Sequence, residues 1–69
     1  MNLQDARIRL NLTHKDIAQI LNINENSYLR YEHYKVKPNV IIAIEISKIL
    51  RCSVDELFDA NYYEGKNAS

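Results

Sequence analysis

The chain has 69 residues, enough for one small domain but not for a second core or a large catalytic cleft. Hydrophobic residues make up 46% of it, with one glycine and one proline, a composition typical of a compact helical bundle and not of a disordered chain. Nine basic and nine acidic residues give zero net charge, so any contact with a polyanion must come from a local patch.

The residue types also exclude several kinds of site. One cysteine cannot form an internal disulfide, and the single glycine, at position 65, cannot form a glycine-rich phosphate loop. His14, His33 and the scattered acids do not have metal-ligand spacing. We therefore expect no enzyme activity, no cofactor and no metal site.

No apolar run resembles a signal peptide or reaches membrane-spanning length. We expect a soluble, cytoplasmic protein with no membrane partner. The abundance of Asn, Ile, Lys and Tyr is typical of an AT-rich genome, which favours a bacterial, phage or other mobile-element origin.

Residues 2–10 predict a first helix, whose inward positions are Leu3, Ala6, Leu10 and, as a further candidate, Ile8. Two short helical patterns follow between Thr13 and Tyr34, separated by a turn at residues 22–24. Thr13 with Asp16 predicts a capping box, and Asn24 is a favourable N-cap for the second helix. The predicted contact faces are Ile17, Ala18 and Leu21 on one helix and Tyr28 and Tyr31 on the other, with Ile23 between them and small Ala18 at the crossing.

The second of these helices has an outward polar stripe. At 100° per residue, Asn26, Leu29, Arg30 and His33 lie opposite its two tyrosines. Such a stripe is typical of a helix that reads the major groove of DNA.

Pro38 ends this motif, and Asn39 caps a long apolar helix over residues 40–51. One face carries Val40, Ala43, Ile44, Ser47 and Leu50 and is expected to pack under the motif, while Ile42, Ile46 and Ile49 form a second face, with Ile41 apart. A helix that is apolar on more than one side is either central to a bundle or part of an interface, and both interpretations stay open.

Ser53 and Glu56 predict another capping box, for a short closing helix that ends at Phe58. Residues 59–69 are polar apart from Tyr62 and Tyr63. This tail either frays, folds back onto the closing helix or crosses to a partner subunit.

The order and spacing of these elements over Leu3–Phe58 resemble the Cro-like phage repressor family, a helix-turn-helix family of the XRE type. The positions that match as residue types are Leu3, Arg7, Leu12, Thr13, Asp16, Ile17, Ala18, Leu21, Arg30, Tyr31, Glu32, Lys35, Lys37, Pro38 and Ser53–Leu57. The resemblance implies an all-α, lambda-repressor-like bundle of five short helices in residues 1–58, with helices 2 and 3 as the helix-turn-helix. Residues 59–69 are then a C-terminal tail that can contribute to a dimer interface.

The resemblance also implies a function. The chain is expected to be a transcriptional regulator, and specifically a repressor. It is expected to bind double-stranded DNA as a homodimer and to insert helix 3 (about residues 25–33) into the major groove. Base contacts are expected from Glu25, Asn26 and Arg30, and phosphate contacts from His14, Lys15, Asn24, Lys35 and Lys37. Residues 1–37 carry six basic and four acidic side chains, a positive imbalance around the motif.

The resemblance further assigns structural roles. Arg7 and Glu32 are expected to form an ion pair that ties the first helix to the third. Cys52, at a position that the family fills with a small apolar residue, is expected to be buried and inert. Separately from the resemblance, the second apolar face of residues 40–51 and the tail predict a dimer interface that consists of Ile42, Ile49, Phe58, Tyr62 and Tyr63.

The chain departs from the family at three turn positions where glycine is usual, namely Asn11, Asn22 and Tyr34. Asn tolerates the left-handed conformation, but Tyr does not take it easily. We therefore expect the third helix to run on past Tyr34 or the following loop to differ.

The neutral charge, Glu25, Leu29 and the surplus isoleucines favour a second hypothesis. In it the same fold is a protein-interaction module, such as an antirepressor or an antitoxin-like partner.

Overall fold

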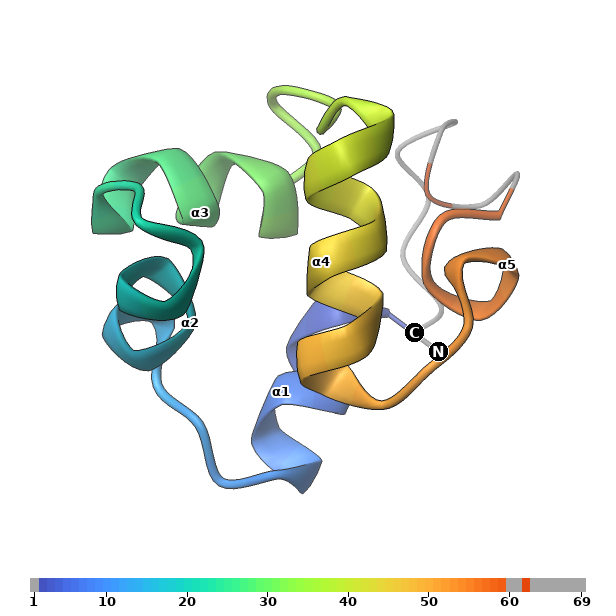
Figure 1. The fold of residues 1–69 in the computed structure, drawn as a ribbon, viewed down its shortest axis with the longest axis horizontal. Helices are drawn as coiled ribbons and strands as arrows, with labels where there is room; N and C mark the ends of the chain where they lie inside the picture. Colours follow the sequence, from blue (N-terminus) through green and yellow to red (C-terminus); the bar gives the residue numbers. More distant parts are fainter. Residues whose placement is uncertain (1, 60–61, 63–69) are drawn as a thin grey trace.

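The computed structural model describes residues 2–59 and 62, and this part of the chain contains five α-helices and no strand (Figure 1). They are α1 (Leu3–Arg9), α2 (His14–Leu21), α3 (Glu25–Glu32), α4 (Val40–Leu50) and α5 (Val54–Leu57). The all-α bundle of five short helices expected from the sequence is confirmed. None of the described helices is long and apolar enough to cross a bilayer.

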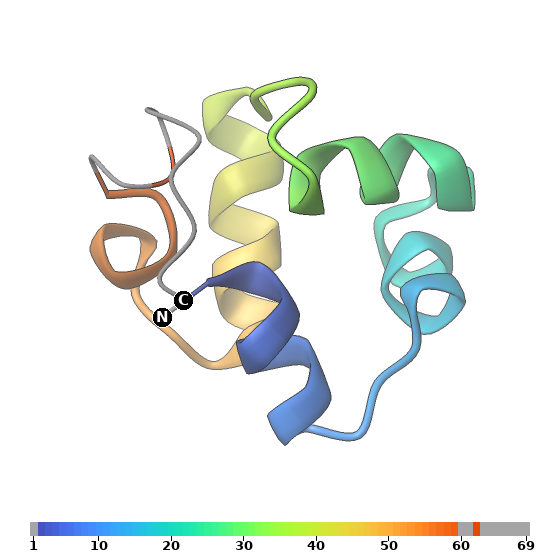
Figure 2. The same cartoon turned by 180° about the vertical axis from the view of Figure 1, so that it is seen from behind.

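The helices surround one core. α2 packs against α3 and α4, and α5 lies against the other side of α4. Figure 2, the view from behind, shows α1 lying over the lower half of α4, between α2 and α5. This arrangement leaves α3 at the outside of the bundle, with only its inner side covered.

Every helix begins at a polar cap whose side chain accepts a hydrogen bond from the amide three residues later. The caps are Asn2, Thr13, Asn24, Asn39 and Ser53. In α2 the exchange is reciprocal, because Asp16 N donates to Thr13 Oγ1 at 3.0 Å and Thr13 N donates to Asp16 Oδ2 at 2.8 Å. The hydrogen bond from the Thr13 amide lowers the pKa of Asp16. Both predicted capping boxes, at Thr13 and Ser53, are confirmed.

Four helices end in the same way, at a non-glycine residue in the left-handed conformation. These residues are Asn11, Asn22, Tyr34 and Arg51, with φ between 58° and 62°. In each case the next amide donates back to the last turn of the helix, as Lys35 N does to Arg30 O at 2.9 Å.

The first alternative predicted for Tyr34, that the third helix runs on past it, was therefore wrong. α3 ends at Glu32, and Tyr34 takes the conformation in which the family has glycine, with φ of 62°. Tyr34 can take this unfavourable backbone conformation because its ring packs against the core and contacts the ring of Tyr62. The loop to α4 thus starts where a glycine would have started it.

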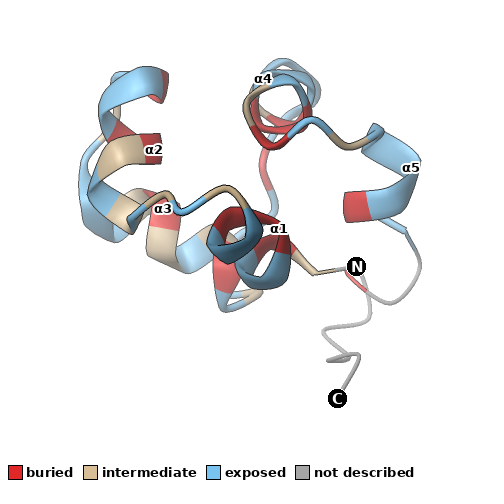
Figure 3. Ribbon diagram, turned by 90° about the horizontal axis from the view of Figure 1, so that it is seen from below, coloured by how far each residue is buried: buried red, intermediate tan, exposed pale blue. Residues whose placement is uncertain are grey.

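The core draws on all five helices (Figure 3). Its buried apolar residues are Leu3, Ala6, Ile17, Ala18, Leu21, Tyr28, Ala43, Ile46, Leu50, Leu57, Phe58 and Tyr62. The predicted inward faces of α1 and α2 are confirmed except at Ile8, which is exposed because α1 directs Arg7 inward instead. Cys52, predicted to be buried, is half-buried, and Arg9 Nη2 donates to its sulfur at 3.2 Å.

The orientation of α4 differs from the prediction. Val40, with 74% of its surface exposed, and Ile44 lie outside, whereas Ile46 is fully buried. The buried side of the helix is centred on Ala43, Ile46, Ser47 and Leu50, because α2 and α5 cover α4 from two directions. α4 is thus central to the bundle, and its exposed side carries Val40, Ile41 and Ile44 together with the charged Glu45 and Lys48.

Candidate nucleic-acid interface

The turn between α2 and α3 is short and fixed at both ends. Asn22 ends α2 in the left-handed conformation, and Ile23 N donates to Ala18 O at 3.0 Å. Asn24 then caps α3, since its Oδ1 accepts from Ser27 N at 2.7 Å. Ala18 is buried where the two helices meet, so that they can approach closely. The two helices are therefore held in one relative orientation.

The inner side of α3 is anchored by Tyr28 and Glu32, the two buried residues of the helix. Its outer side carries Asn26 and Arg30, two of the three side chains predicted to contact bases, and both are exposed. The third, Glu25, is exposed in the first turn of the helix. Of the predicted outward stripe, His33 is exposed as well and Leu29 is half-buried. The helix thus presents amide and guanidinium groups on its outer side, with a carboxylate at its N-terminal end.

The side chains predicted to contact phosphate come before and after this helix in the sequence. Lys15 on α2, Asn24 before α3, and Lys35 and Lys37 after it are exposed. Because the Asn24 side-chain oxygen caps the helix, its amide nitrogen is the group left to donate. His14 differs from these four, since it is half-buried and contacts α3.

A buried cluster ties α1, α2 and α3 together behind that surface. Arg7 Nε donates to Glu32 Oε2 at 2.9 Å, and Arg7 Nη2 donates to Glu32 Oε1 at 3.4 Å. The ion pair that the resemblance implied is present. Arg7 Nη1 also donates to Leu12 O at 2.8 Å, so the guanidinium holds the loop before α2 as well.

Sequence reasoning missed the third member of the cluster. His14 Nε2 lies 3.3 Å from Glu32 Oε1, although the two residues are 18 positions apart. No local pattern marks this contact, because it depends on how α2 and α3 cross.

Tyr28 lies beside the cluster with its side chain fully buried. Its ring centroid is 6.2 Å from that of His14, and its hydroxyl has no hydrogen-bond partner among the described residues. Burial away from water, together with the negative charge of Glu32, raises the pKa of Tyr28. The phenol therefore stays neutral in the folded chain.

Two residues predicted for a dimer interface lie instead in the core of their own chain. Phe58 is 6% exposed and Tyr62 is 3% exposed, and the centroids of their rings lie 4.9 Å apart. Tyr62 Oη donates to Tyr31 O at 2.9 Å, which fastens the C-terminal segment to α3. The prediction failed because a chain this small needs these aromatic rings for its own core. Ile42 and Ile49 are half-buried, and Tyr63 lies outside the described residues.

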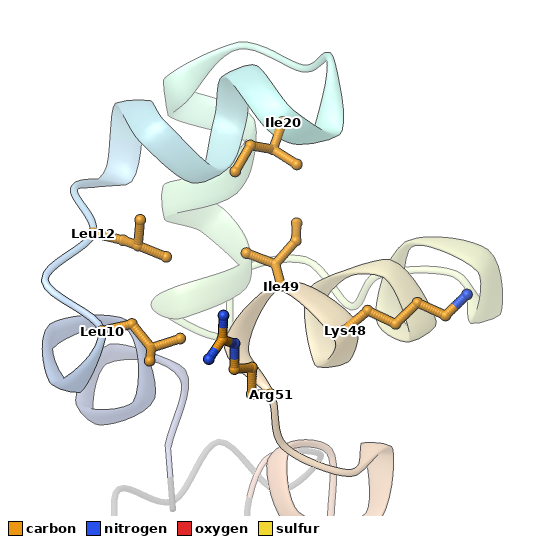
Figure 4. A pocket seen from close by; sticks show the side chains of 6 residues that line it. All are labelled: Leu10, Leu12, Ile20, Lys48, Ile49 and Arg51. Atoms are coloured by element: carbon orange, nitrogen blue, oxygen red, sulfur yellow. The ribbon is translucent and has the colours of Figure 1, made fainter.

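A shallow apolar hollow of about 430 Å³ lies where α2, α4 and the loop after α1 meet (Figure 4). Its lining residues are Leu10, Leu12, Ile20, Lys48, Ile49 and Arg51. Ile20 from α2 and Ile49 from α4 point toward one another across it, and Ile20 is 60% exposed. None of these residues belongs to the predicted DNA contacts.

In the described part of the chain, no group of three or more His, Cys, Asp or Glu side chains could hold a metal ion.

A protein-family model described as helix-turn-helix matches residues 3–57. No curated protein and no solved structure gives a match.

Proposed function

The chain belongs to the XRE-type helix-turn-helix family of DNA-binding proteins, and from this we propose that it is a sequence-specific transcriptional repressor that binds operator DNA as a homodimer. The observation that carries the proposal is the division of α3 into two sides. Tyr28 and Glu32 hold one side in the core, and Glu25, Asn26 and Arg30 lie exposed on the helix. A helix held in this way can enter the major groove without unfolding the bundle.

Each exposed group of α3 suits a base edge. The Arg30 guanidinium can donate two hydrogen bonds to O6 and N7 of guanine, and the Asn26 amide can pair with N6 and N7 of adenine. Glu25 can accept from the amino group of cytosine, while its charge disfavours an approach to phosphate. We propose Arg30 and Asn26 as the main readers, and Glu25 as a selective contact.

Phosphate contacts are proposed for Lys15, Asn24, Lys35 and Lys37, which flank α3 on both sides in sequence. His14 completes the set from the start of α2. Each lysine that neutralises a phosphate releases counterions, so affinity should fall steeply as salt rises.

A homodimer is supported by the exposed apolar residues of α4. Val40, Ile41 and Ile44 are exposed, and Ile42 and Ile49 are half-buried. Two copies joined there would read half-sites about one helical turn, roughly 34–36 Å, apart. Sedimentation at increasing concentration tests this part, and a monomer at the highest concentration rejects it.

The test of the whole proposal is selection of bound fragments from randomised duplex DNA, first at low and then at physiological salt. Wild type is compared with Arg30→Ala and Asn26→Ala, and with Gln4→Ala, an exposed residue of α1, as the matched control. We expect a short inverted repeat from wild type and the control, and relaxed or lost specificity in the two α3 variants. Each lost base contact should weaken binding by about 1–3 kcal/mol. No enrichment by wild type at low salt rejects the proposal.

A second candidate function, that of a protein-interaction module, is favoured by the hollow between α2 and α4. Four of its six lining residues are apolar, and the two ionisable ones, Lys48 and Arg51, are both basic. The occupant that fits is an amphipathic helix of a partner with acidic residues beside its apolar face. Selection from a displayed library of helical peptides should then enrich such sequences on wild type and on Ile8→Asp, but not on Ile20→Asp. Enrichment of no peptide, or of peptides unaffected by Ile20→Asp, rejects it.

A further inference from the structure

His14 is the one proposed phosphate contact that also contacts a buried carboxylate. Its Nε2 lies 3.3 Å from Glu32 Oε1, with 32% of the His14 side chain and 2% of the Glu32 side chain exposed. The imidazole therefore connects the interior of the domain with the surface that is proposed to face DNA.

The carboxylate fixes which ring nitrogen carries a proton. An ionised carboxylate only accepts hydrogen bonds, so Nε2 of His14 must be protonated to bond to Glu32. Glu32 forms an ion pair with Arg7, which donates to both of its oxygens and holds the carboxylate in place. The second ring nitrogen, Nδ1, has no hydrogen bond to any described residue.

A phosphate oxygen also only accepts. In the neutral ring with Nε2 protonated, Nδ1 is a bare acceptor and cannot bond to phosphate. If the ring shifted its single proton to Nδ1, a bare Nε2 would face the Glu32 carboxylate. His14 can satisfy Glu32 and a phosphate together only when both nitrogens are protonated.

The surrounding groups leave this ring as the one whose charge can change. Arg7 from α1 stays protonated, and Tyr28 from α3 stays neutral because burial raises its pKa. On α2 itself, Asp16 is bonded to Thr13 and Lys15 is exposed and cationic. Histidine is the side chain that ordinarily gains or loses its charge near neutral pH.

We propose that His14 is a proton-coupled phosphate contact, oriented by Glu32, so that DNA binding takes up one proton at its Nδ1. This inference rests on the proposed DNA-binding function and adds that binding requires His14 to take up a proton. Since the complex holds one proton more than the free partners, lower pH favours binding. By linkage, one proton corresponds to a change in Kd of at most about tenfold per pH unit.

The test measures Kd for the duplex recovered by wild type, from pH 6 to 8.5 at fixed ionic strength. Three proteins are compared: wild type, His14→Gln and His33→Gln. The Gln side chain can donate from one amide nitrogen to Glu32 and to phosphate without taking up a proton. We expect wild type and His33→Gln to bind more weakly as pH rises, by up to about tenfold per unit. His14→Gln should show no such dependence.

The outcomes separate the two claims. If wild type binds no duplex at any pH, the proposed function itself fails. If it binds with a pH-independent Kd, or if His14→Gln keeps the wild-type pH dependence, only the proton-coupled contact is rejected. Loss of the pH dependence in His33→Gln would instead assign the proton to His33, the exposed residue that follows α3.

A second measurement does not depend on variants. Ring ¹⁵N chemical shifts of His14, followed with pH in the free protein and in the complex, report directly on Nδ1. The cationic form should persist to higher pH in the complex, whereas equal titration in both states would overturn the inference.

Discussion

The ring of Tyr34 meets the ring of Tyr62 edge on, with centroids 5.1 Å apart and planes inclined at 65°. Tyr34 has a left-handed backbone, a conformation that costs about 1–2 kcal/mol for a residue with a side chain. An aromatic pair contributes about 0.5–1.5 kcal/mol beyond the burial of its area. The contact with Tyr62 therefore offsets a large part of the strain at the end of α3.

This balance predicts an unusual order of stability at position 34. Tyr34→Ala keeps the strained backbone and loses the ring, so it should lower the free energy of unfolding by about 2 kcal/mol. Tyr34→Gly also loses the ring but relieves the strain, and should be more stable than the alanine variant by about 1 kcal/mol. Urea unfolding measures both. The neighbouring Lys35, which lacks a positive φ, serves as control, because alanine should be at least as stable as glycine there.

Arg7→Ala removes the only basic residue within hydrogen-bond distance of both Glu32 oxygens in the described structure. The buried carboxylate then keeps only the partly exposed His14 as a partner, so the free energy of unfolding should fall by about 3–5 kcal/mol. Replacing both residues by leucine should recover part of this loss, since no charge is then left buried. Lys15→Ala, an exposed cation on α2, should change stability by less than about 0.5 kcal/mol. Unchanged thermal stability of Arg7→Ala would mean that the pair does not matter to the fold.

Tyr28→Phe removes a buried hydroxyl that has no hydrogen-bond partner among the described residues. A buried polar group without a partner is costly, so the variant should be as stable as wild type or more stable, by about 1 kcal/mol. Chemical denaturation checks this. A loss of about 1 kcal/mol would instead show that the hydroxyl donates a hydrogen bond, with Glu32 as the nearest candidate.

Stability should also decline in alkali. Burial raises the pKa of Tyr28 and, with smaller effects of nearby acids, that of Tyr34 above the value in the unfolded chain. The unfolded chain therefore releases protons first, at about pH 10, and stability that is complete below this pH is lost above it. For buried Tyr28 the slope is at most about 1.4 kcal/mol per pH unit. Urea unfolding from pH 8 to 11 should show a shallower decline for Tyr28→Phe than for wild type, and equal slopes would contradict the assignment.

The sequence predicts the helices well because their signals are local. Thr13 and Ser53 cap helices through partners three residues away, and the periodic apolar residues of α2 define its buried face. The exposure of Asn26 and Arg30 follows in the same way from the spacing of Tyr28 and Tyr31 on one helix.

Tertiary relationships are harder to obtain from one chain. The contact of His14 with Glu32 depends on how two helices cross, and the burial of Tyr62 depends on a segment that returns to α3. At Tyr34 the local rule disfavoured the observed backbone, and a contact 28 residues further along the chain made it tolerable. On α4 the pattern of apolar residues was too dense to indicate which side would be covered.

Four helix ends built without glycine also affect the chain before it folds. Asn11, Asn22, Tyr34 and Arg51 each restrict the unfolded backbone more than glycine would, by an amount equivalent to about 0.4–1 kcal/mol per position. The denatured ensemble is correspondingly smaller, and less conformational entropy is lost when the turns form. This effect on the unfolded state is smaller than the cost of about 1–2 kcal/mol of a left-handed backbone at a residue with a side chain, so it offsets only part of the strain at these turns.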